Sequence, residues 1–195
     1  MKTTQSTRPS GFTLIELLIV ISIIAVLAAI SIPTTAMVMN MTRKAQAGTQ
    51  ISNLVNAIKV YETDNGTLPV GAGGGAEEIE TDQNFIDILT GHDTEFNPKE
   101  IVYFEGKQAK KASGNRPERG GMVNEGGGSQ SLVDPWGNYY MVIMDPSDEN
   151  EIVVPQIEDP VRANVVAWCW GKPEDKEDFK SARKNPHKDW IKSWK

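Results

Sequence analysis

Two adjacent residues and one acidic side chain near the N-terminus have types and spacing that could do chemistry. Gly11 precedes Phe12, and Glu16 lies four residues further on, inside an apolar run. Glycine lets the backbone approach another molecule closely at low steric cost. An acid inside an apolar run is a candidate functional group, and its partner has to be identified.

The apolar run around Glu16 predicts the element that positions it. Residues 12–32 carry Glu16 as their single charge. As a helix, such a run would be roughly 31 Å long, close to the roughly 30 Å hydrocarbon core of a bilayer. The preceding residues 1–11 are polar and basic, and positive charge is retained on the cytoplasmic side. We therefore expect a basic leader, 1–11, and a single-pass transmembrane and assembly helix, 12–33.

The acid in this run needs an explanation, because an ionisable side chain inside a membrane costs about 2–3 kcal/mol on insertion scales. A carboxylate in hydrocarbon needs a cation as its partner, so Glu16 is a candidate functional residue. The alternative is a tolerated acid in a plain anchor. An ordinary secretory signal fits less well, because its apolar core spans only about 7–15 residues.

The residues Gly11-Phe12-Thr13-Leu14-Ile15-Glu16, followed by an apolar stretch, resemble the processing signature of type IV prepilins and type II secretion pseudopilins. The resemblance implies that a prepilin peptidase cuts between Gly11 and Phe12 and N-methylates Phe12, so both residues would be substrate and neither would be catalytic. The cut would free an α-amine at Phe12, which could pair with Glu16 of a neighbouring subunit and offset the cost of its charge. Glu16 is therefore predicted to guide assembly. It also implies a homopolymer built with other pseudopilins, an assembly ATPase and an inner-membrane platform protein. The N-terminus would be cytoplasmic and the head periplasmic, first at the bacterial inner membrane and then in a periplasmic filament.

Residues 34–64 are predicted to form the amphipathic second half of the same long helix. Apolar residues recur there at three- and four-residue steps and would pack on a head: Ala47, Ile51, Leu54, Val55, Ile58 and Tyr61. The polar residues on the other side are Gln50, Asn53, Asn56 and Lys59. Pro33 is expected to kink the helix rather than end it. Gly66 or Asn65 would take a left-handed conformation where the helix stops.

Residues 65–195 are predicted to form a globular head, and the fold class is α+β: a pilin-like long helix packed on a small antiparallel sheet. A short helix is expected at 84–90. The expected strands are 101–104, 139–144, 152–154 and a last one at 165–170. The glycine-rich residues 71–75 read as a connector, and residues 92–131 as a long loop whose part from 108 onward is mobile.

Two head segments carry further resemblance to the major pseudopilin of type II secretion systems. Asp134-Pro135-Trp136-Gly137 predicts a tight turn, with proline at its second and glycine at its fourth place, and is similar to a hallmark of that subunit. The C-terminal Asp189-Trp190-Ile191 is similar to its closing segment. The single cysteine, Cys169, lies between two tryptophans and is expected to be a buried apolar residue.

The residues favour no cofactor, and calcium is the alternative that the resemblance raises. Calcium prefers six to eight oxygen ligands. The loop before the closing segment supplies acids, and Asp189 is the best-placed ligand: Glu174, Asp175, Glu177, Asp178 and Asp189. Interleaved lysines oppose a dication there. The two histidines, His92 and His187, have no metal-ligand spacing.

The sequence thus predicts a structural subunit of a type II secretion pseudopilus, and not an enzyme. The net charge of −6 argues against a nucleic-acid partner. One alternative is a minor pilin of a type IV pilus, which a paired cysteine loop would favour. The other is a membrane-tethered periplasmic binding module that uses the 92–131 loop as its contact surface.

Overall fold

The computed structural model describes residues 11–70, 77–111, 118–147, 149–155, 157–174, 179–186 and 189–194. The side chains of residues 30–34, 179 and 180 lie outside this set, as do the predicted leader residues 1–10, the connector 71–75 and His187. The chain divides into two compact units, residues 1–42 and 43–195. Each unit is described by itself.

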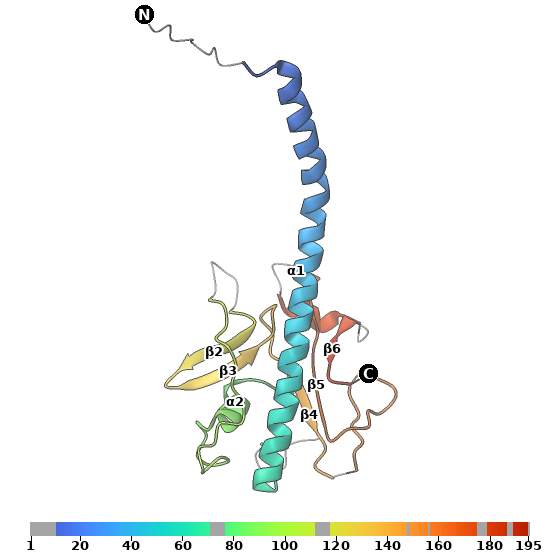
Figure 1. The fold of residues 1–195 in the computed structure, drawn as a ribbon. Helices are drawn as coiled ribbons and strands as arrows, with labels where there is room; N and C mark the ends of the chain where they lie inside the picture. The colour runs from blue at the N-terminus through green and yellow to red at the C-terminus, as the bar shows by residue number, and fades with distance from the viewer. Residues whose placement is uncertain are drawn as a thin grey trace, which may run out of the picture. The chain divides into compact units, whose positions relative to one another are not determined.

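The predicted long helix is present as one element, α1 (Leu14–Asn65), which contributes to both units (Figure 1). It continues through residue 33, so the alternative that the helix ends there is wrong, while the kink stays a prediction. It stops at the predicted place. The φ of Gly66 is +69°, and its N–H donates to the carbonyl of Glu62 at 2.7 Å.

No helix among the described residues combines the length and the apolar character that crossing a membrane requires.

The second half of α1 packs into the head along the predicted stripe. All six apolar residues of that stripe are buried in one core cluster, which also contains Val142 and Ala167 of the sheet. Asn53, Asn56 and Lys59 are exposed as expected, but the prediction for Gln50 was wrong. Gln50 is buried because its side-chain oxygen accepts a 2.6 Å hydrogen bond from the Tyr140 hydroxyl.

The head contains the predicted antiparallel sheet. Its order is β1 (Ile79–Glu80), β4 (Met141–Met144), β5 (Val165–Cys169) and β6 (Ile191–Lys192). Alternation along β4 and β5 separates two cores, since successive side chains of a strand point to opposite faces. Val142 and Ala167 belong to the α1 core, whereas Ile143 and Trp168 belong to a second cluster. Both faces of these two strands are therefore buried.

The short predicted helix is α2 (Gln83–Thr90), which has both expected ends. The Asp82 side chain caps it by accepting from the Phe85 N–H at 3.1 Å. Gly91 ends it in the left-handed conformation, with φ at +81°. A 3₁₀ helix, η1 (Phe179–Lys184), follows β5.

The long 92–131 loop was predicted wrongly in its last third. A hairpin of β2 (Gly121–Gly126) and β3 (Ser129–Val133) occupies it, and Met122 and Leu132 reach the core. The glycines that suggested a mobile loop form the hairpin turn: residues 126–128 all have positive φ. The Asp87 carboxylate accepts from the Gln130 N–H at 2.9 Å and ties β3 to α2.

Three strand predictions also need correction. Residues 101–104 are not a strand, because the N–H groups of Tyr103 and Phe104 both donate to the carbonyl of Leu89 instead of to a neighbouring strand. Residues 152–154 reduce to an isolated bridge between Ile152 and Val161. The strand at 165–169 is not the last, since β6 pairs with it at Trp168↔Lys192.

A substitution at the start of β2 can test how closely this strand packs on its neighbours. We expect Gly121→Ala to destabilise the chain by about 2 kcal/mol or more, because a Cβ there would overlap the Lys107 carbonyl oxygen and lie 2.9 Å from the Ala109 nitrogen. Thermal unfolding of the detergent-solubilised chain measures the effect. Gly48→Ala is the matched control. Its Cβ would meet Ile191 at an ordinary 3.8 Å, and alanine favours a helix, so this variant should be neutral or more stable. Equal stability of the two variants would contradict the packing.

Candidate functional site: the start of the long helix and the Asp134 turn

The first turn of α1 is closed by a reciprocal pair of side chains. Glu16 Oε2 accepts from the Thr13 N–H at 2.9 Å and from the Thr13 hydroxyl at 2.6 Å. The Glu16 N–H is directed back to Thr13 Oγ1 at 3.4 Å. This is a capping box, in which the first and fourth residues satisfy each other's free N–H groups. In the single chain, Glu16 is therefore partnered within its own turn.

Thr13 was missed as a site residue, although its signal is in the sequence. A threonine three residues before a glutamate, directly ahead of an apolar run, is the pattern of a capping box. The pair uses only one oxygen of the carboxylate. Among the described residues, nothing donates to Glu16 Oε1. That oxygen could accept from a group outside the chain.

The predicted cleavage site precedes the helix. Gly11 and Phe12 are non-helical and exposed, with 74% of Phe12 accessible. A Cβ on Gly11 would meet nothing within 4 Å, so the structure itself does not require glycine at this position. The described residues therefore leave the space around this position open.

The apolar side chains that follow are exposed on every side of the helix. The exposed large apolar residues run from Leu14 to Leu27 and continue at Met37–Met41. Soluble proteins do not keep so large an apolar surface in water. A helix that is apolar all round is normally surrounded by lipid or by other helices.

Asp134 organises the predicted turn in the head. Its Oδ1 accepts from the N–H groups of Trp136, Gly137 and Asn138 at 2.8, 2.7 and 3.0 Å. Its carbonyl oxygen accepts from the Gly120 N–H at 2.7 Å, which joins the turn to the start of the hairpin. Gly137 has φ at +99°, a conformation that favours glycine. The motif at residues 134–137 therefore stabilises the turn and its connection to the hairpin.

Burial gives this aspartate unusual electrostatics. Asp134 is fully buried, and burial raises its pKa to about 7 although three backbone N–H groups favour the charged form. Its second oxygen, Oδ2, receives no N–H or O–H hydrogen bond in the described part of the chain. The Cys169 thiol lies beside the carboxyl. Burial raises the pKa of that thiol well above its usual range, so Cys169 is an inert core residue, as predicted.

The C-terminal segment packs through tryptophans. Trp168 of β5 stacks on Trp190 with ring centroids 5.7 Å apart, and Trp194 meets it edge-on at 6.0 Å. Asp189 lies next to this cluster with its side chain exposed. The described residues contain no group of three or more potential metal ligands. Residues 175, 177 and 178 of the predicted acid set lie outside them, so calcium at Asp189 stays a prediction.

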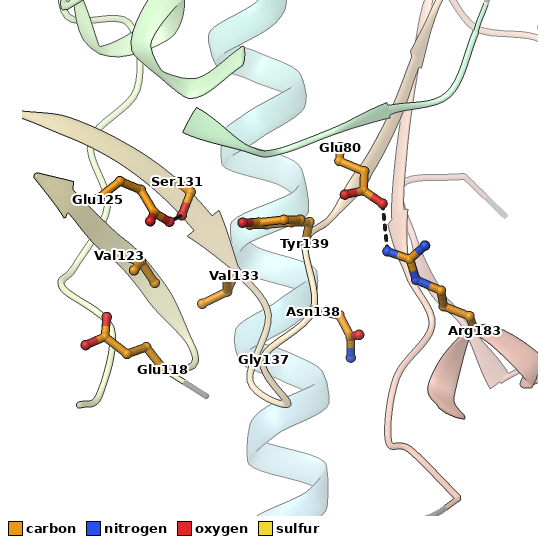
Figure 2. Close-up of a pocket in the computed structure, with 10 residues that line it drawn as sticks. All are labelled: Glu80, Glu118, Val123, Glu125, Ser131, Val133, Gly137, Asn138, Tyr139 and Arg183. Carbon is orange, nitrogen blue, oxygen red and sulfur yellow. Dashed lines mark hydrogen bonds and ion pairs between the residues drawn. The ribbon is translucent and has the colours of Figure 1, made fainter. Parts of the chain in front are cut away.

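A pocket of about 370 Å³ lies between the hairpin and the sheet, and the sequence did not reveal it (Figure 2). Figure 2 shows Tyr139 between the hairpin residue Glu125 and the ion pair of Glu80 with Arg183. The Glu80–Arg183 distance is 2.6 Å, and Glu125 accepts from the Ser131 hydroxyl at 2.6 Å. The pocket is lined by three acids and one arginine, so it presents a mixed polar surface with an excess of negative charge.

Known proteins share the sequence features of the N-terminal segment. Residues 7–32 match the family described as the prokaryotic N-terminal methylation motif. The chain is 28% identical over 147 residues to the type II secretion system core protein G of Vibrio cholerae, covering 75% of this chain and 78% of that protein. It is 28% identical over 142 residues to the protein of the same name from Aeromonas hydrophila, covering 71% and 76%.

A third relative, the core protein G of Pseudomonas aeruginosa, is 26% identical over 139 residues, covering 71% of this chain and 76% of that protein. No solved structure matches the chain. The predicted resemblance to the pseudopilins is confirmed by these matches, and residues 11–16 lie within the matched motif. The α+β fold, a long helix against a small antiparallel sheet, is confirmed by the structure.

The raised pKa of Asp134 makes a testable prediction. Because its folded pKa of about 7 lies above the ordinary 3.8, the folded state holds an extra proton between these values. Its stabilising contribution is fully present below about pH 4 and is lost as pH rises through 7, by up to about 4 kcal/mol. Asp134→Asn cannot titrate, so unfolding measured from pH 4 to 8 should show the wild type losing more stability than this variant.

Asp145→Asn is the control for this experiment. The Ser147 hydroxyl lowers the pKa of Asp145, so its contribution is present above about pH 4 and is lost as pH falls. Between pH 4 and 8 this control should therefore keep the wild-type pH profile, and it should differ from the wild type only below about pH 4. Parallel profiles for wild type and Asp134→Asn would show that Asp134 is already ionised in the folded chain.

Proposed function

We propose that this chain, a pilin-like protein that resembles the type II secretion major pseudopilins, is a structural subunit of a secretion pseudopilus and polymerises through α1. The observation that carries the proposal is the start of α1, where a single acid precedes an apolar surface exposed on every side. The matched methylation motif and the relatives named core protein G support it. The role is mechanical, and no residue is assigned to catalysis.

Processing is the first step of this function. A prepilin peptidase cleaves between Gly11 and Phe12 and methylates the new amine of Phe12. The site is non-helical and exposed, and its glycine has free space around it, which supports access by a protease. Residues 12–33 anchor the monomer in the bacterial inner membrane, with the head in the periplasm. The assembly ATPase and the platform protein then add it to the filament.

Assembly uses the free oxygen of Glu16. In the single chain, Oε2 is held by Thr13, whereas Oε1 has no donor among the described residues. The Phe12 amine of a neighbouring subunit donates to Oε1, so the cap and the intersubunit pair coexist. A carboxylate and an amine that meet in an apolar surrounding stabilise each other strongly, and neither stays there unpaired. This pair sets the axial register between neighbouring helices.

The capping box makes the assembly test sharper. Glu16→Gln keeps the cap but removes the charge, whereas Thr13→Ala removes the cap but keeps the charge. Leaving the amine unpaired costs about 3 kcal/mol or more, which lowers the association constant roughly 100-fold. We expect Glu16→Gln chains to be processed but not to form filaments, and Thr13→Ala chains to form them. Sedimentation of sheared filaments with electron microscopy measures this.

The two variants also separate the alternatives. A tethered binding module, or a Glu16 that only caps the helix, predicts normal behaviour for Glu16→Gln. Filaments of Glu16→Gln in wild-type amounts would therefore contradict the proposed function.

Processing has its own test. Gly11→Leu should leave an uncut precursor, because a large side chain beside the scissile bond would not fit a cleft that accepts glycine. Mass spectrometry of the membrane-extracted protein, from a host with the peptidase, reads the N-terminal residue directly. Gly48→Ala should be cleaved normally. A mature Gly11→Leu chain starting at Phe12, or a wild-type chain starting at Met1, would contradict the predicted cleavage.

A further inference from the structure

A small basic pocket opens at the start of the second unit. Its volume is about 80 Å³, and three cationic side chains from separate segments line it together with Gln46, Gly120 and Pro135. The cations are Arg43 of α1, Lys110, and Arg119 just ahead of β2. No lining residue is acidic, although the whole chain has a net charge of −6. Three like charges converge here in an otherwise acidic protein.

Hydrogen bonds hold the segments that carry these cations together, and the charges of the three side chains are not neutralised by ion pairs in the described part of the chain. Lys110 and Arg119 are joined by backbone hydrogen bonds in both directions, at 2.9 and 3.3 Å. Gln46 donates to the Gly120 carbonyl at 2.9 Å, which fixes this loop on α1 one turn beyond Arg43. In the described part of the chain, none of the three cations makes an ion pair. Arg43 and Arg119 are half-buried, so their positions are restricted.

The geometry points to a phosphate-binding pocket whose occupant is the headgroup of an anionic phospholipid. A phosphate offers several oxygens and a negative charge, and arginine binds it through two parallel N–H groups. The volume suits a single tetrahedral group, since pockets for drug-sized ligands hold about 300–1,000 Å³. A phosphate would relieve the repulsion among the three cations.

The lipid source follows from the spacing of charges along the chain, and this step rests on the proposed function. Glu16 and Arg43 are separated by 26 uncharged residues, 17–42. As a helix, this segment is roughly 39 Å long, whereas the hydrocarbon core of a bilayer measures about 30 Å. With Glu16 just inside the core at its cytoplasmic edge, Arg43 would lie beyond the opposite edge, on the side where the lipid phosphates of the other leaflet lie. Basic residues at such a surface are attracted to anionic lipids.

The test uses the full, processed chain as a monomer in an uncharged detergent. Isothermal titration compares soluble dihexanoyl-phosphatidylglycerol, dihexanoyl-phosphatidylcholine and inorganic phosphate. We expect phosphatidylglycerol to bind best, at least about tenfold tighter than inorganic phosphate. Arg43→Gln and Arg119→Gln should each weaken it about tenfold or more, because each removes a charge-assisted contact. Added salt should weaken binding further.

Controls separate a defined pocket from general attraction. Lys59→Gln removes a charge from the exposed face of the same helix and should leave binding unchanged. Arg119→Lys keeps the charge and should retain most of the binding. This variant separates the loss of charge from a loss of stability if Arg119→Gln is unstable. Glu16→Gln should bind lipid normally. Lipid binding can therefore be judged separately from filament assembly, even where the assembly proposal fails.

Three results would overturn the inference. Equal weakening by Lys59→Gln would show non-specific attraction to the chain. Inorganic phosphate that binds as tightly as the lipid would make the pocket a site for free anions. Unchanged lipid binding in Arg43→Gln and Arg119→Gln, together with lost filaments, would assign the pocket to a carboxylate of a neighbouring subunit.

Discussion

The apolar surface around the first part of α1 has to be covered by lipid or by other helices. The proposed function of this protein depends on that constraint. The side chains from Leu14 to Leu27 are exposed on all sides, so no single partner face would cover them. Lipid tails can cover them, and so can a bundle of identical helices. Apolar packing distinguishes weakly between these surroundings, because lipid is as apolar as leucine. In the proposed filament, a polar group such as Glu16 would decide where neighbouring helices align.

The head can follow the helix because side chains far apart in the sequence tie them together. Tyr140 donates to Gln50, Tyr61 donates to the Phe96 carbonyl at 2.5 Å, and Gln46 donates to the Gly120 carbonyl. These bonds lie along the buried stripe of α1 and join it to three different parts of the head. A subunit of the proposed filament would need this connection between the second half of α1 and the head. The Asp134 turn supports it by bracing Gly120.

Several features were predictable from local pattern. The buried stripe of α1, its stop at Gly66 and the capped helix α2 follow from periodicity and from end signals, which act over one or two turns. The Asp134 turn was predicted, but its buried carboxylate with a pKa of about 7 was not, because burial depends on distant segments such as Cys169 of β5. Thr13 was overlooked, although its capping pattern is local.

The sequence by itself determined the signature at residues 11–16, the long helix and the small α+β head, because these depend on neighbouring residues and on apolar spacing. Only the tertiary structure decided that residues 121–133 form a hairpin, that β6 joins the sheet, and that Gln50 is buried. It alone brought Arg43, Lys110 and Arg119 into one pocket. Such features depend on contacts between segments far apart in the chain, and no local pattern encodes which distant segments will meet.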